Sequence, residues 1–267
     1  MTQLLAERGA EVWHTDWRAL LGRARELGGV DSLIVDAPYS ERTHVANDCS
    51  AGRDPRSMKD PGKVNRPLNY ACWSHSDVAA FCSSWCPAVR GWMVSVTDHV
   101  LARAWADEME AAGRYVFSPI ACVQSGSRIR LLGDGPAQWS TFAVVSRPRD
   151  GAWLSSWRSE RLGRGEVVSL PGAYVVPPGE SDRSPVVGGK PLWLMRALVR
   201  DYTRPGNLVC DPCCGAGTTG MAAIMEGRRV LLGDAMEEHA RLAVERLRAM
   251  PGETKAGQLA LLGGSGE

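Results

Sequence analysis

The chain alternates between short apolar runs and amphipathic segments. Runs of strand length lie at residues 11–14, 31–36, 91–96, 114–124, 138–146, 208–211 and 229–234. Helical spacing of apolar residues marks residues 19–27, 76–85, 100–112, 191–202, 218–225 and 237–250. Strands that alternate with helices in this way predict an α/β fold, with a mostly parallel, twisted sheet and helices on both of its faces.

Three stretches lack a regular spacing of apolar residues. Residues 40–70 contain six Lys or Arg among Pro, Gly, Asn, Asp and Ser, which predicts a long, mobile loop. Residues 149–189 are rich in Arg, Gly, Pro, Ser and Trp and are interpreted as a small insert, and the Gly-rich residues 251–267 as a flexible tail. We therefore expect one domain built from residues 1–148 and 190–250.

Composition narrows the class of protein. The 267 residues are 44% hydrophobic and 23% charged, which is typical of a globular chain. There is neither a membrane-length apolar run nor a signal-like start, so we expect a cytoplasmic protein. Eight cysteines then indicate reduced thiols. The spacings Cys82-x3-Cys86 and Cys210-x2-Cys213 also fit a zinc site, but helical spacing favours core packing for the first pair, and no metal is predicted.

A glycine-rich turn follows the apolar run at 208–211. Residues 211–220 read DPCCGAGTTG and open a helix. Glycines let backbone amides approach a ligand, and the start of a helix offers unpaired N–H groups. Gly215, Gly217 and Gly220 match the dinucleotide fingerprint, with Asp234 placed to bind ribose hydroxyls. An αβ turn that merely needs small residues produces the same pattern.

A second motif, DAPY at residues 36–39, ends another apolar run. Asp36 accepts hydrogen bonds, Pro38 fixes the backbone, and Tyr39 offers a flat aromatic face. These are suitable groups for binding a planar amine. Taken alone, the motif also fits a strand followed by an ordinary turn.

The two motifs together resemble the amino-methyltransferases of DNA, which transfer methyl from S-adenosylmethionine to N6 of adenine or N4 of cytosine. DAPY at 36–39 is similar to the catalytic D-P-P-Y motif of that family, and 211–217 to its D-P-F-x-G-x-G cofactor loop. KPL at 190–192 resembles the K-P-x-x-L entry to the cofactor site, and LGD at 232–234 resembles the ribose-binding strand end. Asp16 lies where the family has an acidic residue at a strand end.

The catalytic motif precedes the cofactor loop, which resembles the permuted β class of the family. The resemblance covers residues 11–146 and 188–248 and implies a circularly permuted, Rossmann-like, S-adenosylmethionine-dependent methyltransferase fold. Ala37 replaces the first Pro of D-P-P-Y, but that position contributes a backbone carbonyl, so we expect activity to survive. Cys213 replaces an aromatic residue of the cofactor loop.

The resemblance assigns roles to individual residues. The catalytic set is Asp36, Ala37, Pro38 and Tyr39. The implied cofactor is S-adenosylmethionine, bound by Asp16, Lys190, Pro191, Asp211, Cys213, Gly215, Gly217, Thr218, Thr219 and Asp234. His44 and His99 are interpreted as structural, since methyl transfer to an amine needs no strong general base.

A nicotinamide-dependent oxidoreductase is disfavoured by the length of chain that follows the glycine loop. Only 47 residues follow Gly220, too few for the second half of a dinucleotide-binding fold. The missing strands must come from the N-terminal part. The permuted methyltransferase resemblance implies the same, and it implies that Asp36 and Gly215 lie side by side at the carboxyl edge of adjacent central strands.

The implied substrate is double-stranded DNA, with the target base flipped into the site. The net charge of +1 favours no partner, but residues 114–164 contain eight arginines and three acidic residues. We expect DNA contacts from the loop and from the insert, which is the candidate target-recognition region. The residues are Arg42, Arg53, Arg56, Lys59, Lys63, Arg66, Arg128, Arg130, Arg158 and Arg161.

The resemblance leaves the modified base open. The Asp at the first motif position favours N6 of adenine, and N4 methylation of cytosine by the same machinery is the alternative. The alternative hypothesis from another functional class is a catalytically degenerate DNA-binding module. A homodimer and a companion restriction endonuclease, as in restriction-modification systems, are further partners that the sequence leaves open.

Overall fold

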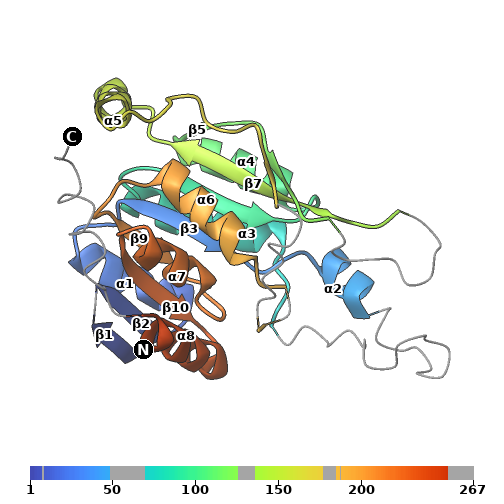
Figure 1. Cartoon of the computed structure of the whole chain (residues 1–267). Helices are drawn as coiled ribbons and strands as arrows, with labels where there is room; N and C mark the ends of the chain where they lie inside the picture. The colour runs from blue at the N-terminus through green and yellow to red at the C-terminus, as the bar shows by residue number, and fades with distance from the viewer. Residues whose placement is uncertain (8, 49–69, 126–135, 177–184, 187, 252–267) are drawn as a thin grey trace, which may run out of the picture.

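The computed structural model describes residues 1–7, 9–48, 70–125, 136–176, 185–186 and 188–251. Its strands form a single sheet of order β1-β2-β10-β9-β3-β4-β7-β6-β8, with β5 paired to β7 (Figure 1). The strands are β1 (Thr2–Glu7), β2 (Ala10–His14), β3 (Ser32–Asp36), β4 (Met93–Thr97), β5 (Tyr115–Val116), β6 (Ile120–Val123), β7 (Ser140–Arg147), β8 (Ala173–Val175), β9 (Leu208–Asp211) and β10 (Arg229–Asp234).

The centre of the sheet is parallel, as predicted. β2, β10, β9, β3 and β4 run in one direction, and the C-terminal strands β9 and β10 lie between the N-terminal strands β2 and β3. Beyond β4 the pairing changes, because β7 is antiparallel to β4, β5 and β6. The carboxyl ends of β3 and β9 are therefore neighbours, in agreement with the prediction.

Helices cover both faces of the sheet (Figure 1). Along β3, Leu33 and Val35 pack with α1 (Trp17–Glu26), α3 (His75–Trp85) and α4 (Ala102–Ala111). Ile34 points to the opposite layer, formed by α6 (Leu192–Tyr202), α7 (Thr218–Met225) and α8 (Glu237–Ala249). Alternating apolar side chains thus fill two cores. None of the described helices is long and apolar enough to span a membrane.

Several elements differ from the sequence prediction. β1 was not predicted, since it is an edge strand with mostly exposed side chains. Residues 41–48, predicted as loop, form α2 (Glu41–Asp48), and residues 114–124 divide into two strands. The rest of the predicted loop, 49–69, and the tail 252–267 lie outside the described residues. Cys82 and Cys86 are buried in the core, which confirms their predicted packing role.

The described part of the predicted insert, residues 149–176, 185–186 and 188–189, is continuous with the main core. α5 (Gly151–Gly163) packs through Trp157, whose ring centroid lies 5.3 Å from that of Trp92, and β8 pairs with β6. The sequence did not predict these elements because α5 buries only one stripe of side chains and β8 is three residues long.

One predicted DNA contact is wrong. The Arg161 side chain on α5 is only 6% exposed. Its guanidinium donates to the carbonyls of Val167 and Asp201 and forms an ion pair with Glu166. Arg161 therefore joins α5 to α6 and is inaccessible to a phosphate. The spacing of arginines along the sequence did not reveal which side chain faces inward.

We expect Arg161→Gln to lower the free energy of unfolding by about 2 to 4 kcal/mol, since buried acceptors lose their donor. The matched control is Arg158→Gln, an exposed position on the same helix, which should change stability by less than about 0.5 kcal/mol. Urea denaturation measures both. Equal midpoints for the two variants would contradict the structural role of Arg161.

Candidate active site

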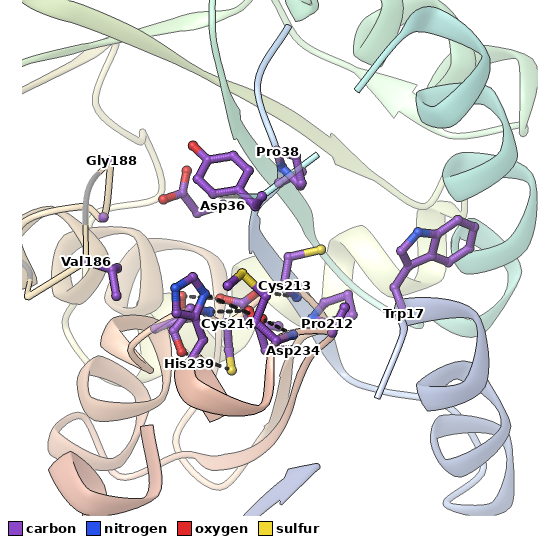
Figure 2. Close-up of a pocket in the computed structure, with 18 of the residues that line it drawn as sticks. Trp17, Asp36, Pro38, Val186, Gly188, Pro212, Cys213, Cys214, Asp234 and His239 are labelled. Atoms are coloured by element: carbon purple, nitrogen blue, oxygen red, sulfur yellow. Dashed lines mark hydrogen bonds and ion pairs between the residues drawn. The ribbon is translucent and has the colours of Figure 1, made fainter. Parts of the chain in front are cut away.

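The carboxyl ends of β3, β9 and β10 open onto one cavity of about 450 Å³. Its walls also include the start of α1 and the segments that precede α3 and α6. Figure 2 shows Asp36 on one side of the cavity, Asp234 and His239 on the other, and Cys213 between them. A cavity at the carboxyl edge of parallel strands is the usual ligand site of such folds, and this volume suits a small molecule or cofactor.

The glycine loop lies between β9 and α7. Gly217 caps α7 with φ of 76°, a left-handed conformation that favours glycine. A Cβ at this position would lie 2.8 Å from the Cβ of Ala243, so the loop backbone packs directly against α8. The loop thereby presents its backbone and the first turn of α7 toward the cavity.

Asp211, at the end of β9, holds the glycine loop through two hydrogen bonds. Its carboxylate accepts hydrogen bonds from Thr219 Oγ1 at 2.5 Å and from the Cys213 amide at 3.1 Å. Burial raises the pKa of Asp211 to about 7, against the opposing effect of these hydrogen bonds. Asp211 therefore ties the strand end to the first turn of α7 and also lines the cavity.

Asp234, at the end of β10, also holds the glycine loop by hydrogen bonding. It accepts from the Gly215 amide at 2.8 Å and from the Met236 amide at 2.9 Å. His239 Nδ1 lies 3.6 Å from Asp234 Oδ1, and hydrogen bonding to that carboxylate raises the pKa of the imidazole. The sequence did not single out His239, which lies on α8 without a motif of its own.

The Asp36 carboxylate has a cationic partner. Lys190 Nζ lies 2.8 Å from Oδ1 and 2.9 Å from Oδ2 of Asp36, and it donates to the Gly188 carbonyl at 2.8 Å. The same ammonium lies 4.7 Å from the centroid of the Tyr39 ring. The Tyr39 hydroxyl, 3.4 Å away, also donates to Asp36. Lys190, predicted from the resemblance to contact the cofactor, therefore contacts the predicted catalytic carboxylate.

Asp98, at the end of β4, anchors the segment after the DAPY motif. Its buried carboxylate accepts from the Ser40 amide at 3.0 Å and the Ser40 hydroxyl at 2.6 Å. It also accepts from the hydroxyl of Thr43 at 2.6 Å and from the amides of Val100 and Leu101. Burial alone raises a carboxyl pKa, but these hydrogen bonds outweigh it and hold the Asp98 pKa below its usual value. This network was not predicted.

The structure brings most of the predicted cofactor and catalytic residues to one cavity. The predicted residues that line it are Asp16, Asp36, Ala37, Pro38, Tyr39, Lys190, Asp211, Cys213, Gly215, Thr218, Thr219 and Asp234. Pro191 and Gly217 lie beside it, at the N-caps of α6 and α7. Trp17, Trp73, Met195 and His239 also line the cavity, although no motif marked them.

The predicted DNA contacts are more scattered. Arg42 on α2 and Arg158 on α5 are exposed, whereas Arg161 is buried. The other predicted contacts lie outside the described residues: Arg53, Arg56, Lys59, Lys63, Arg66, Arg128 and Arg130.

Comparison with known proteins finds a family model that matches part of the chain. Residues 153–245 match the model of a family described as DNA methylase, a match that includes the glycine loop and excludes the DAPY motif. The chain is 38% identical over 60 residues to the type II methyltransferase M2.DpnII of Streptococcus pneumoniae, covering 22% of each chain. The matched stretches span about a quarter of the length of the curated relatives.

Solved structures share the fold. The M1.HpyAVI–SAM complex matches with a TM-score of 0.62 at 19% identity, over 89% of this chain and 98% of that chain. The cytosine-N4-specific PvuII DNA methyltransferase matches with a TM-score of 0.59 at 12% identity, over 94% and 90% of the two chains. The Rossmann-like methyltransferase fold predicted from the motifs is confirmed.

Asp98→Asn should lower the free energy of unfolding by about 2 to 4 kcal/mol, because the amide presents N–H groups to partners that also donate. Since the folded-state pKa of Asp98 is lowered, its contribution is present above the unfolded pKa of about 4 and is lost as pH falls through the folded value. Urea denaturation at pH 7 and pH 3 measures this. Asp107→Asn, in a solvent-facing pair on α4, is the control, and equal losses in the two variants would contradict the prediction.

Proposed function

We propose that this chain is a DNA methyltransferase of the N6/N4 type, which methylates the exocyclic amine of a DNA base with S-adenosylmethionine. The observation that carries the proposal is one cavity that joins the Asp36 carboxylate to the glycine loop. Methyl transfer needs an acceptor amine and a methyl donor in contact, and neighbouring strand ends provide the two binding sites for them.

The residues present fit the cofactor. The cavity is lined by the carboxylates of Asp16, Asp36 and Asp234 and by Asp211, whose pKa burial raises to about 7, and this lining suits a ligand with positively charged groups. The glycine loop brings the backbone of Gly215 to the cavity wall without a side chain, next to Thr218 and Thr219 in the first turn of α7. S-adenosylmethionine, when bound, supplies a methyl group on a positively charged sulfur. Asp234 is the proposed residue for the ribose hydroxyls, since it already orients the loop through the Gly215 amide.

The base amine that receives the methyl group needs hydrogen-bond acceptors around it. The lone pair of a base amine is delocalised into the ring, so the protein has to orient the nitrogen and accept its hydrogens. The Asp36 carboxylate accepts one N–H and the carbonyl of Ala37 accepts the other, which favours a tetrahedral nitrogen with its lone pair free. Tyr39 offers its ring to the base.

We propose N6 of adenine as the methylated atom, because the catalytic motif begins with Asp. N4 of cytosine is the alternative, and a cytosine-N4-specific enzyme shares the fold. The proposed substrate is duplex DNA with the base flipped into the cavity, at a cost of a few kcal/mol that stacking and phosphate contacts offset. Arg42 and Arg158 are exposed and suited to such contacts.

The first test is to incubate the protein with S-adenosylmethionine and unmethylated mixed-sequence DNA, and to identify modified nucleosides by mass spectrometry. N6-methyladenine is the expected product. N4-methylcytosine would keep the proposed mechanism and reverse the choice of base. Absence of both products, together with absence of cofactor binding, would favour the degenerate DNA-binding module.

Asp36→Asn should reduce methylation about 100-fold or more, because the amide cannot accept hydrogen bonds as a carboxylate does. Transfer of tritiated methyl groups to DNA measures the rate, and circular dichroism checks the fold. A variant with near-normal activity would show that another group orients the amine. Asp107→Asn, distant from the cavity lining, is the matched control and should retain the wild-type rate.

A further inference from the structure

The ammonium of Lys190 makes the contacts that a target amine is expected to make. It donates to the Asp36 carboxylate, whose two oxygens lie 2.8 and 2.9 Å away. It also lies over the Tyr39 ring, 4.7 Å from the centroid. In the proposed function, the carboxylate and the ring bind the base. Lys190 and the base therefore compete for the same two groups.

Burial makes this contact more than a surface ion pair. Lys190 is 8% exposed and Tyr39 only 2% exposed. A buried ammonium requires a carboxylate or carbonyl partner at all times, because an unpaired charge in such a place is costly. When Lys190 leaves Asp36 it keeps the Gly188 carbonyl, but a second anion in place of Asp36 makes the move much less costly.

The electrostatics of the cavity indicate which anion that is. Among the described lining residues, the Lys and Arg side chains are Lys190 and Arg18, and Arg18 is exposed and paired with Asp16. Besides Asp36, the wall carries the carboxyl groups of Asp16, Asp77, Asp211 and Asp234, and an imidazole, His239, that is already paired with Asp234. A ligand carboxylate that enters the cavity next to Asp36 thus has Lys190 as its buried cationic partner.

We propose that Lys190 is a positioning residue that occupies the target-amine site of the cofactor-free protein, and that the carboxylate of the bound cofactor draws it off Asp36. The inference rests on the proposed function and adds an order of events to it. Cofactor binding frees the Asp36 carboxylate and the Tyr39 ring, so the base site becomes available only when the methyl donor is in place.

The position of Lys190 permits such a move. It directly precedes Pro191, the N-cap of α6, and its backbone lies outside the helix. A four-carbon stem lets the ammonium change partner while α6 stays packed in the core. The second acceptor, the Gly188 carbonyl, belongs to the same segment and can remain its partner in both positions.

The test is a double-mutant cycle on ligand binding, with no turnover involved. S-adenosylhomocysteine carries the amino-acid carboxylate, and methylthioadenosine lacks it. Calorimetry gives Kd for both ligands with wild type, Asp36→Asn, Lys190→Met and the double variant. When Lys190 is present, we expect Asp36→Asn to lower the Kd for S-adenosylhomocysteine. When Lys190 is replaced by Met, the same substitution should lower that Kd about tenfold less. For methylthioadenosine we expect no such coupling.

A spectroscopic readout reports Lys190 directly. The chain has four lysines, so ¹⁵N-lysine labelling gives few ammonium signals, and the signal absent from Lys190→Met is assigned to Lys190. That signal should shift with S-adenosylhomocysteine and in Asp36→Asn, and should shift little with methylthioadenosine. Arg196→Met, which removes the ion pair between Arg196 on α6 and Glu226 at the end of α7, is the matched control and should leave the ligand-induced shift unchanged.

The outcomes separate the two claims. If wild type binds S-adenosylhomocysteine and the cycle shows no coupling, Lys190 is not exchanged between carboxylates and the inference fails, while the proposed function stands. If wild type binds neither ligand, the proposed function fails and the inference fails with it.

Discussion

The parallel pairing of β3 with β9 is the interaction on which the site depends. Ser32 lies opposite Val209 and Leu33 opposite Cys210, so the two strands end side by side. Asp36 and the glycine loop lie at those ends, although about 180 residues separate them along the chain. A shift of one residue in this register would turn the buried side chains to the wrong face and move the two motifs apart.

Buried carboxylates fix the loops around the cavity. Asp98, Asp211 and Asp234 each accept hydrogen bonds from backbone amides of the segment that follows a strand. These bonds hold irregular backbone in a defined shape, and at Asp98, whose pKa is lowered, the charged acceptor makes them stronger than neutral hydrogen bonds. The cavity is thus pre-organised by groups that are themselves paired, while Asp36 is paired with a side chain that can exchange partners.

Much of the arrangement was predictable because it is local. Apolar runs gave the central strands, and residues 218–225 and 229–234 were predicted with the observed boundaries, because a turn precedes each. The motifs predicted which residues meet at the cavity. The contact of Lys190 with Asp36 was not predictable, since it joins residues from distant segments and depends on side-chain direction. Arg161 shows the same limit, because a row of arginines does not reveal which one is buried.

The strand order has a consequence for how the chain is made. β2 and β3 leave the ribosome before β9 and β10, yet the places beside them in the sheet belong to β9 and β10, which follow all the other described strands along the chain. Until then, the facing edges of β2 and β3 expose unpaired backbone groups, a state in which strands pair wrongly or aggregate. Synthesis must therefore reach residue 234 before the ends of β3, β9 and β10 can form the cavity together, so a nascent chain released earlier has neither the paired central strands nor the cavity.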